Sequence, residues 1–457
     1  MMLVRRGDQA REQSSLLCVA ILFCFAINAL GFAEPRHPVH GIVEKCFILD
    51  ESYVHDLISA SMLSLCNDLG AKDIYILHGN YSGGNYDPNY SGRSEDHRGW
   101  LMNSSQYFQN MQKKVRWDVS EFLLVDLYEN RTARELTPFI KEVAKALWTS
   151  DGQRNLFIIA TFPRILDANR LQPGRKYLRA RNAFKSYKGI LSRLLHSNYR
   201  IMLMVHMPEI LASLGILPEM NDKRVALVLP SRIGYNWAQE HWPWVREIKC
   251  RVMWLAPTYG HFYHDRELFH PLSPPQMVIV GGMSPGKRDY SKIRESFGSI
   301  WTNHTESAKL PIRLKILGSL RPKDATVIDE QLKDIPDTFL LPYGESISYS
   351  AFYSYVNHSS YCLAFFPRES RYYVNAVSSA VLECISWGIP IVIDKYGMEK
   401  LGDGYPPGTF YVFDNIEDFM RLTRSEENYA ALVRRSINAS VSCRKKALSL
   451  VRHWLLH

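Results

Sequence analysis

The sequence has few cysteines, and they follow no metal-binding spacing. Eight occur in 457 residues, and two of these lie near the N-terminus. The other six are dispersed along the chain: Cys46, Cys66, Cys250, Cys362, Cys384 and Cys443. Because structural zinc sites need closely spaced cysteine or histidine pairs, this pattern indicates none. Several of the six lie in apolar segments, which predicts buried thiols rather than a disulfide framework and leaves one or two bridges open.

Recognisable nucleic-acid-binding motifs and long basic runs are also missing, although the net charge is +9. A positive net charge without these motifs favours anionic partners such as nucleotide diphosphates or lipid headgroups over nucleic acid. No convincing pair of carboxylates marks a polysaccharide-degrading enzyme. The hydrophobic fraction of 46% is typical of globular chains, and the length predicts two or three domains.

Only one long hydrophobic run is present, at residues 16–33. It follows a short head (1–15) that contains three arginines and precedes a stem (34–40). This pattern is typical of a membrane anchor with a cytosolic N-terminus, or of a signal peptide cleaved near Ala33. The C-terminal end carries no retention tetrapeptide.

Seven Asn-x-Ser/Thr sequons follow the hydrophobic run: Asn80, Asn89, Asn103, Asn130, Asn303, Asn357 and Asn438. Each alone is weak evidence, but seven behind such a leader favour the secretory lumen. We therefore expect a single-pass type II membrane protein of the endoplasmic reticulum or Golgi, with a secreted glycoprotein as the alternative.

Apolar strand-like runs alternate with helical stretches along the rest of the chain, which predicts parallel sheets covered on both faces. The first series of expected strands is 46–49, 74–77, 122–125, 156–160, 201–205, 225–229 and 252–256. After a Pro-rich joint at 271–275, the second series is 277–280, 313–317, 338–341, 361–366, 389–393 and 409–412. Residues 80–105, rich in Gly, Asn, Ser and Tyr, are expected to form a glycosylated surface loop.

Residues 361–394 carry the clearest local pattern. An apolar run ends at Pro367, helical spacing of apolar residues follows, and Gly388 stands where a helix C-cap belongs before another apolar run. The pattern predicts strand, charged loop, helix, tight turn and strand. Glu383 falls inside the apolar helix, and a buried carboxylate needs a hydrogen-bonding partner, which the sugar hydroxyls of a ligand would supply.

This stretch resembles the donor-binding core of the glycosyltransferase group 1 family, whose motif reads Glu, seven residues, Glu, then a turn and Gly-x-Pro-Val-Val. Glu383 and the segment from Gly388 match its second half. The likeness continues in matching order over residues 200–435: a strand ending at His206, a strand ending at Ser231, and a Gly-rich segment leading to a lysine.

The resemblance implies an α/β chain with two doubly wound Rossmann-like domains facing across a cleft, the GT-B fold. Residues 41–265 would form the N-terminal, acceptor-side domain, and 266–435 the C-terminal domain that binds the nucleotide sugar. A C-terminal helix at 436–457 would pack against the body.

The same resemblance implies the site residues. Donor-binding residues would be Gly281, Gly282, Lys287, Arg288, Arg368, Arg371, Asn375 and Glu383, and catalytic residues His206 and Glu383. Lysine on a Gly-rich loop can approach phosphate oxygens, and helix N-terminal amides also attract an anion. Each residue also has a structural alternative: a solvated turn, a surface ion pair, or a hydrogen-bonded histidine at a strand end.

The sequence departs from the family pattern at two positions. The arginine expected after the loop glycine is Gly282, and the first glutamate of the motif is Asn375, which brings no charge and cannot act as a base. Arg288 or Arg321 would have to supply the missing cation. The exostosin-like family is a lesser option: residues 360–363 and the Glu383 to Ile391 segment resemble its core, but its arginine three residues before the glutamate is alanine here.

No Asp-x-Asp pair occurs in the chain. Such pairs hold the metal and diphosphate in the other major glycosyltransferase fold, so a metal-independent mechanism without a cofactor fits better. We expect a secretory-pathway glycosyltransferase that moves a hexosyl or related group from a nucleotide sugar to a glycan, glycoprotein or glycolipid acceptor. Retention of configuration follows only from the resemblance. The alternative is a catalytically inactive glycan-binding or scaffolding protein of the same fold.

Overall fold

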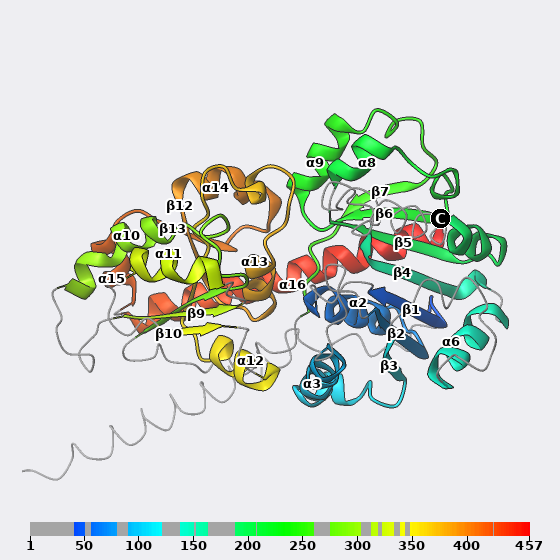
Figure 1. Ribbon diagram of the computed structural model, residues 1–457, viewed down its shortest axis with the longest axis horizontal. Helices are drawn as coiled ribbons and strands as arrows, with labels where there is room; N and C mark the ends of the chain where they lie inside the picture. The colour runs from blue at the N-terminus through cyan, green and yellow to red at the C-terminus, as the bar shows by residue number, and fades with distance from the viewer. Residues whose placement is uncertain are drawn as a thin grey trace, which may run out of the picture. The chain divides into compact units, whose positions relative to one another are not determined.

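A computed structural model describes most of the chain beyond residue 40 (Figure 1). The described residues are 41–50, 56–79, 90–120, 138–149, 152–162, 188–206, 208–259, 275–302, 312–318, 322–332, 339–342, 348–423 and 425–457. The hydrophobic run at 16–33, the expected strand at 122–125, Arg321 and the Pro-rich joint at 271–275, apart from its last residue, lie outside them. Within these described segments, no helix combines the length and the apolar character that crossing a membrane requires.

Seven parallel strands form the first sheet, in the order β3-β2-β1-β4-β5-β6-β7. Their bounds are β1 Lys45–Asp50, β2 Asp73–Gly79, β3 Val115–Ser120, β4 Asn155–Phe162, β5 Arg200–Val205, β6 Val225–Leu229 and β7 Arg251–Trp254. The order reverses direction between β1 and β4, as in Rossmann-like domains.

A second parallel sheet repeats this topology with six strands, in the order β10-β9-β8-β11-β12-β13. Their bounds are β8 Gln276–Val280, β9 Arg313–Gly318, β10 Phe339–Pro342, β11 Tyr361–Leu363, β12 Ile391–Asp394 and β13 Phe410–Phe413. Here the order reverses between β8 and β11. Every expected strand that falls on described residues is present, with its ends shifted by at most three residues.

Helices cover both faces of the sheets (Figure 1). Those of the first part are α2 Asp56–Asp68, α3 Tyr90–Asn103, α4 Gln106–Gln109, α6 Pro138–Thr149, α8 Pro208–Leu214 and α9 Arg232–His241. Those of the second are α10 Tyr290–Thr302, α11 Pro322–Leu332, α12 Tyr349–Asn357, α13 Ser379–Ser386, α14 Lys395–Leu401, α15 Ile416–Thr423 and α16 Glu426–Leu456. Short 3₁₀ helices include η1 Gly152–Arg154, η4 Pro218–Met220, η7 Arg371–Tyr373 and η8 Gly402–Gly404.

The central strands are apolar on both faces because helices pack on each side. In β6, Val225–Leu229, every residue is buried, and in β8 the same holds for Gln276–Val280. This is the pattern expected of parallel sheets enclosed by helices. The predicted C-cap is confirmed: Gly388 has φ of +64°, and Ile389 donates its amide hydrogen to the carbonyl oxygen of Cys384.

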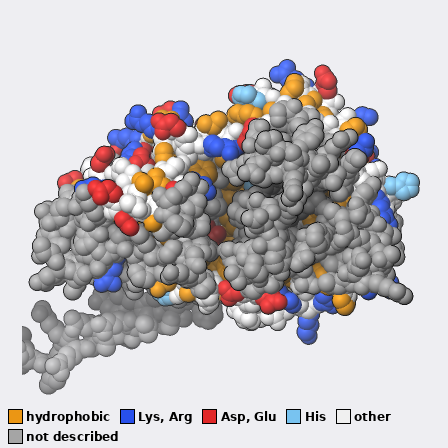
Figure 2. Space-filling view, viewed as in Figure 1, with side chains coloured by type: hydrophobic (Ala, Val, Ile, Leu, Met, Phe, Trp, Pro, Cys, Tyr) orange, Lys and Arg blue, Asp and Glu red, His pale blue; other side chains and the backbone are white. Residues whose placement is uncertain are grey.

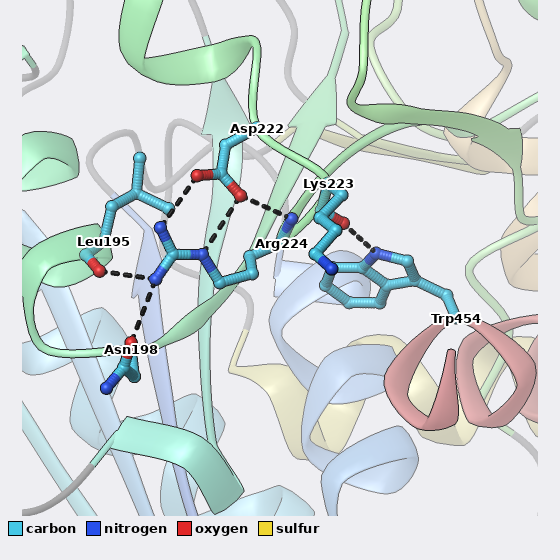
Figure 3. Close-up of polar contacts among 6 residues, drawn as sticks. All are labelled: Leu195, Asn198, Asp222, Lys223, Arg224 and Trp454. Carbon is cyan, nitrogen blue, oxygen red and sulfur yellow. Dashed lines mark hydrogen bonds and ion pairs between the residues drawn. The ribbon is translucent and has the colours of Figure 1, made fainter.

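The C-terminal helix α16 begins at Glu426, ten residues earlier than expected. It contacts helices of the second part of the chain, and also helix α2 and the segment before β6 in the first part. Its Arg444 forms an ion pair with Asp68 at the end of α2, at 2.7 Å. Its Trp454 donates from Nε1 to the carbonyl oxygen of Lys223, just before β6, at 3.2 Å (Figure 3). Beside that contact, Arg224 pairs with Asp222. The helix therefore fastens the end of the chain to the first sheet.

The expected loop at 80–105 is wrong over its second half, because α3 occupies Tyr90–Asn103. Local composition is unfavourable to a helix, so tertiary packing must hold it. Leu101 is fully buried, and the Trp100 ring stacks on Tyr353 of α12 with centroids 3.7 Å apart. Long-range aromatic contacts therefore override weak helix propensity here.

Disulfides pair four of the dispersed cysteines, within the one or two bridges that the sequence left open. The preference for buried thiols is therefore wrong for these four. Cys46 in β1 is bonded to Cys66 in α2, and Cys362 in β11 to Cys384 in α13. Both bridges join a strand to the helix that packs on it. The remaining two described cysteines, Cys250 and Cys443, are free and buried.

We expect the bridge between Cys362 and Cys384 to contribute measurably to stability. Replacing both by alanine should lower the free energy of unfolding by about 3 kcal/mol, because the crosslink restricts the unfolded chain. Denaturant unfolding of oxidised protein would measure this. In dithiothreitol, which reduces both bridges, wild type and the double variant should unfold with nearly equal midpoints. Equal midpoints of the two proteins in the oxidised state would contradict the prediction.

Candidate functional site

The segments that follow β8 and β11 meet where the strand order of the second sheet reverses. Crevices at the carboxyl ends of strands bind ligands at this point in open α/β sheets. Gly281 follows β8 with φ of +100°, a conformation that favours glycine. A Cβ atom there would lie 2.9 Å from Nη2 of Arg288 and 3.7 Å from the hydroxyl of Ser379. Glycine at this position therefore lets Arg288 and the start of α13 approach the end of β8.

Arg288 is buried, with 2% of its surface exposed. Its Nη2 donates to the carbonyl oxygen of Val280 at 2.6 Å and its Nη1 to that of Lys287 at 2.8 Å. The guanidinium lies 5.3 Å from the ring centroid of Phe366 and 5.8 Å from that of Tyr372. Within the described part of the chain, Nε has no acceptor and no carboxylate forms an ion pair with Arg288.

A buried cation surrounded only by neutral partners is unusual, because burying a charge is costly unless it is paired. The Arg288 guanidinium remains charged because arginine does not deprotonate in proteins. The carboxyl end of β8 therefore has a fixed positive charge that an anionic ligand would neutralise.

A cavity of about 480 Å³ adjoins this charge. Residues after β8 and β11 and at the end of β12 line it, including Arg288, Lys292, Phe366, Pro367, Arg368 and Asp394. Lys292 and Asp394 form an ion pair across it. Around the neighbouring α14, basic and acidic side chains lie next to one another (Figure 2), as in the pair of Lys395 with Asp414. The lining also includes Asp289, Glu295 and Glu369, so the cavity as a whole is not basic. Its positive charge is local to Arg288 and Arg368, which form no ion pair among the described residues.

The N-terminus of α13 lies beside the same loop. Ser378 occupies the N-cap position but makes no side-chain capping bond. Its hydroxyl is buried, with 3% of the residue exposed, and has no partner among the residues described. The first-turn amides and this hydroxyl are donors available to an anion held near Gly281.

Glu383 finds its hydrogen-bonding partner within the protein. Its Oε1 accepts from the hydroxyl of Tyr259 at 2.7 Å and from Nε1 of Trp387 at 3.3 Å. Burial and the Glu383 carboxylate raise the pKa of Tyr259 well above its ordinary value, so this hydroxyl stays protonated and donates. Tyr259 follows β7, so the contact joins the end of the first sheet to α13. Binding of ribose by Glu383 stays a prediction.

Arg371 and Asn375 face a carboxylate from helix α8, which follows strand β5 of the first sheet. Glu209, in the first turn of α8, forms an ion pair through Oε1 with Arg371. Its Oε2 accepts from Nδ2 of Asn375 at 3.3 Å. The structure therefore gathers Arg371 and Asn375 around Glu209, and Arg288 and Arg368 around the cavity.

The other predicted residues lie near these two groups. His206 directly follows β5, three residues before Glu209, and its Nε2 lies 2.9 Å from the carbonyl oxygen of Ala160 in β4. Lys287 is exposed and Gly282 partly exposed on the loop after β8. Of the predicted site residues, the cavity lining among the described residues includes Arg288 and Arg368. It does not include His206, Gly281, Gly282, Lys287, Arg371, Asn375 or Glu383. Their proposed roles stay predictions.

Three residues of this region were not singled out from the sequence: Glu209, Tyr259 and Ser378. Glu209 carried one usable signal, an acidic residue just after a strand that ends in histidine. Tyr259 carried none, because its partner Glu383 lies far from it in the sequence. Ser378 carried none either, because its hydroxyl has no partner among the described residues that could have pointed to it. No group of three or more His, Cys, Asp or Glu side chains within the described ranges is arranged to hold a metal ion.

No protein-family model matches the sequence, and no curated protein sequence matches it. Among solved structures, an α-glucosyltransferase in complex with UDP-glucose and DNA containing an abasic site is similar, with a TM-score of 0.54 and 13% identity over 90% of this chain and 99% of that chain. A glycosyltransferase from Rickettsia africae ESF-5 aligns with a TM-score of 0.47 and 9% identity over 90% and 99% of the two chains.

The first likeness shows the fold alone, and it is the GT-B arrangement of two parallel α/β sheets. The expected fold class is confirmed in this respect. The boundary expected at 265 and 266 and the N-terminal leader lie outside the described residues.

Proposed function

We propose that the chain is a glycosyltransferase whose second sheet binds the diphosphate of a nucleotide sugar. The observation that carries this proposal is Arg288, a buried guanidinium without an acidic partner among the described residues, next to a cavity of about 480 Å³. A departing diphosphate develops negative charge, and fixed donors aimed at that charge are the main catalytic requirement of such a transfer.

The donor would lie between the Gly281 loop and the start of α13. Its phosphate oxygens would accept hydrogen bonds from Arg288 and Arg368 and from the first amides of α13. The exposed Lys287, next to Arg288 in the sequence, would donate to the same phosphates. UDP-glucose in the similar α-glucosyltransferase supports nucleotide sugars as the donor class. His206 and Arg371 would contact the sugar end. Group 1 resemblance supports a metal-independent, retaining transfer to a glycan, glycoprotein or glycolipid.

We place the protein in the secretory pathway, as a type II membrane protein or a secreted one. The two disulfides support an oxidising compartment. Two sequon asparagines, Asn103 and Asn438, are exposed and accessible to glycosylation. The hydrophobic run at 16–33 would supply the membrane attachment.

An inactive glycan-binding protein of the same fold is the second candidate. Gly282 and Asn375 favour it, because both remove a charged group from the family pattern. An exostosin-like enzyme remains the lesser alternative.

A donor screen separates these functions. Purified protein from residue 34 onward, made with its disulfides, would be titrated with UDP, GDP, ADP and CMP and then assayed for hydrolysis of UDP-glucose, UDP-N-acetylglucosamine and GDP-mannose. The proposal expects at least one nucleotide to bind and its sugar derivative to be hydrolysed. Sugar binding without binding of any nucleotide would favour the inactive lectin-like function instead.

A further inference from the structure

Glu209 brings a carboxylate to the position where the 375–383 motif lacks one. Residue 375 is asparagine, so the motif itself supplies no charge there. Glu209 lies in α8, which packs on the first sheet. It contacts this segment through both carboxylate oxygens, Oε1 with Arg371 and Oε2 with Asn375.

The approach is fixed by backbone packing around it. Helix α9 begins beside the same segment, and a Cβ atom on Gly234 would lie only 2.9 Å from the carbonyl oxygen of Asn375. The Ser231 hydroxyl caps that helix by accepting from the Gly234 amide at 3.0 Å. Helix α8, which carries Glu209, packs against α9. Because α9 lies this close to the Asn375 backbone, packing as well as the ion pair holds Glu209 near the motif.

The amide oxygen of Asn375 indicates what binds there. Asn375 uses its Nδ2 to donate to Glu209, which turns its Oδ1 away from the carboxylate. That Oδ1 is buried and has no donor among the described residues. Unsatisfied buried acceptors are rare and call for a partner. The carboxylate and the unsatisfied amide oxygen are both acceptors, so a ligand group that binds to the two of them is a donor such as a sugar hydroxyl.

We propose that Glu209 is a donor-binding residue that accepts hydrogen bonds from hydroxyl groups of the transferred sugar, in place of the glutamate missing at position 375. Asn375 is then a positioning residue that orients the carboxylate, and Arg371, at the sugar end of the site, also holds it in place. This inference rests on the proposed function, because it assigns the sugar end of the same donor site.

The competing interpretation is that Glu209 blocks the site. As an anion paired with Arg371, it would occupy a cation that the diphosphate needs, and its removal would strengthen nucleotide binding. The two interpretations predict opposite effects of the same substitution, which makes them easy to separate.

The test compares Glu209→Gln with wild type by calorimetric titration of UDP against UDP-glucose and of GDP against GDP-mannose. We expect the affinity for the sugar nucleotide to fall about 10- to 100-fold, the effect of losing hydrogen bonds to a charged acceptor. The affinity for the plain nucleotide should change by less than about twofold. The exposed Glu240→Gln on α9 is the matched control and should change neither.

A second variant keeps the test independent of folding defects. In Glu209→Gln/Asn375→Glu the carboxylate returns on the motif's own segment, and affinity for the sugar nucleotide should recover by about tenfold or more. Equal losses for nucleotide and sugar nucleotide, or tighter binding of both, would overturn the proposal for Glu209. If wild type binds none of the four ligands, the proposed function itself fails.

Discussion

Replacing Arg288 by methionine should lower the affinity for nucleoside diphosphates about 100-fold or more while leaving the protein folded. Methionine occupies a similar volume but removes the buried charge and its hydrogen bonds. Charge-assisted bonds to phosphate are among the strongest polar contacts in proteins, and a binding site that loses its central cation loses several of them. Isothermal titration with UDP and GDP would measure the change.

The folded state should tolerate this substitution, because Arg288 has no ion pair to break among the described residues. What it loses are two bonds to backbone carbonyls and contacts with two aromatic rings. The matched control is Arg421→Met, which removes one exposed cation from α15 and should leave nucleotide affinity unchanged. Equal nucleotide affinity of Arg288→Met and wild type would show that the diphosphate is not bound at the end of β8.

Acid should destabilise the protein steeply, because two histidines are buried in neutral form. His78 at the end of β2 and His97 in α3 are both 0% exposed. Burial lowers the pKa of each to about 3, and for His97 the neighbouring His78 adds to the effect. The unfolded chain takes up protons below pH 6.5, whereas the folded chain does not until about pH 3. Stability is therefore full above pH 6.5 and is lost as the pH falls toward 3.

Between pH 7 and pH 5 each histidine should remove about 2 kcal/mol from the free energy of unfolding. Urea unfolding at a series of pH values would measure this slope. His97→Phe should reduce the slope by about half, and it should cost little at pH 7.5 because, among the described residues, neither ring nitrogen of His97 has a hydrogen-bond partner. The exposed His241→Phe is the control. A slope that survives His97→Phe unchanged would contradict the prediction.

Most of the second sheet and its turns could be predicted from the sequence because their signals are local. The segment from Tyr361 to Asp394 shows strand, loop, helix and strand in its own apolar spacing, and Gly388 marks the turn by its required backbone conformation. Strands such as β5 and β6 are continuous apolar runs, which only an enclosed parallel strand explains.

Elements that depend on distant partners could not be predicted in this way. The edge strand β3, Val115–Ser120, mixes polar and apolar residues, since only one neighbour covers it. Helix α3 depends on the contact of Trp100 with Tyr353.

The candidate site shows the same division between local and distant information. Gly281 and Arg288 could be named from a loop motif, whereas the partners of Glu383 and Arg371 come from remote segments. Sequence spacing could not place Tyr259 or Glu209 beside them. The cost of burying the Glu383 carboxylate predicted that it has a partner, but the fold decides which residues provide it.

Hydrogen exchange with and without a nucleoside diphosphate tests the central claim most directly. Saturating UDP or GDP should slow exchange of the amides at 281–288 and 379–382, because those groups would face the phosphates. Amides of the first sheet far from Glu209 should exchange at unchanged rates. Binding of a nucleotide that leaves 281–288 and 379–382 unprotected, or that protects a different surface, would contradict the account.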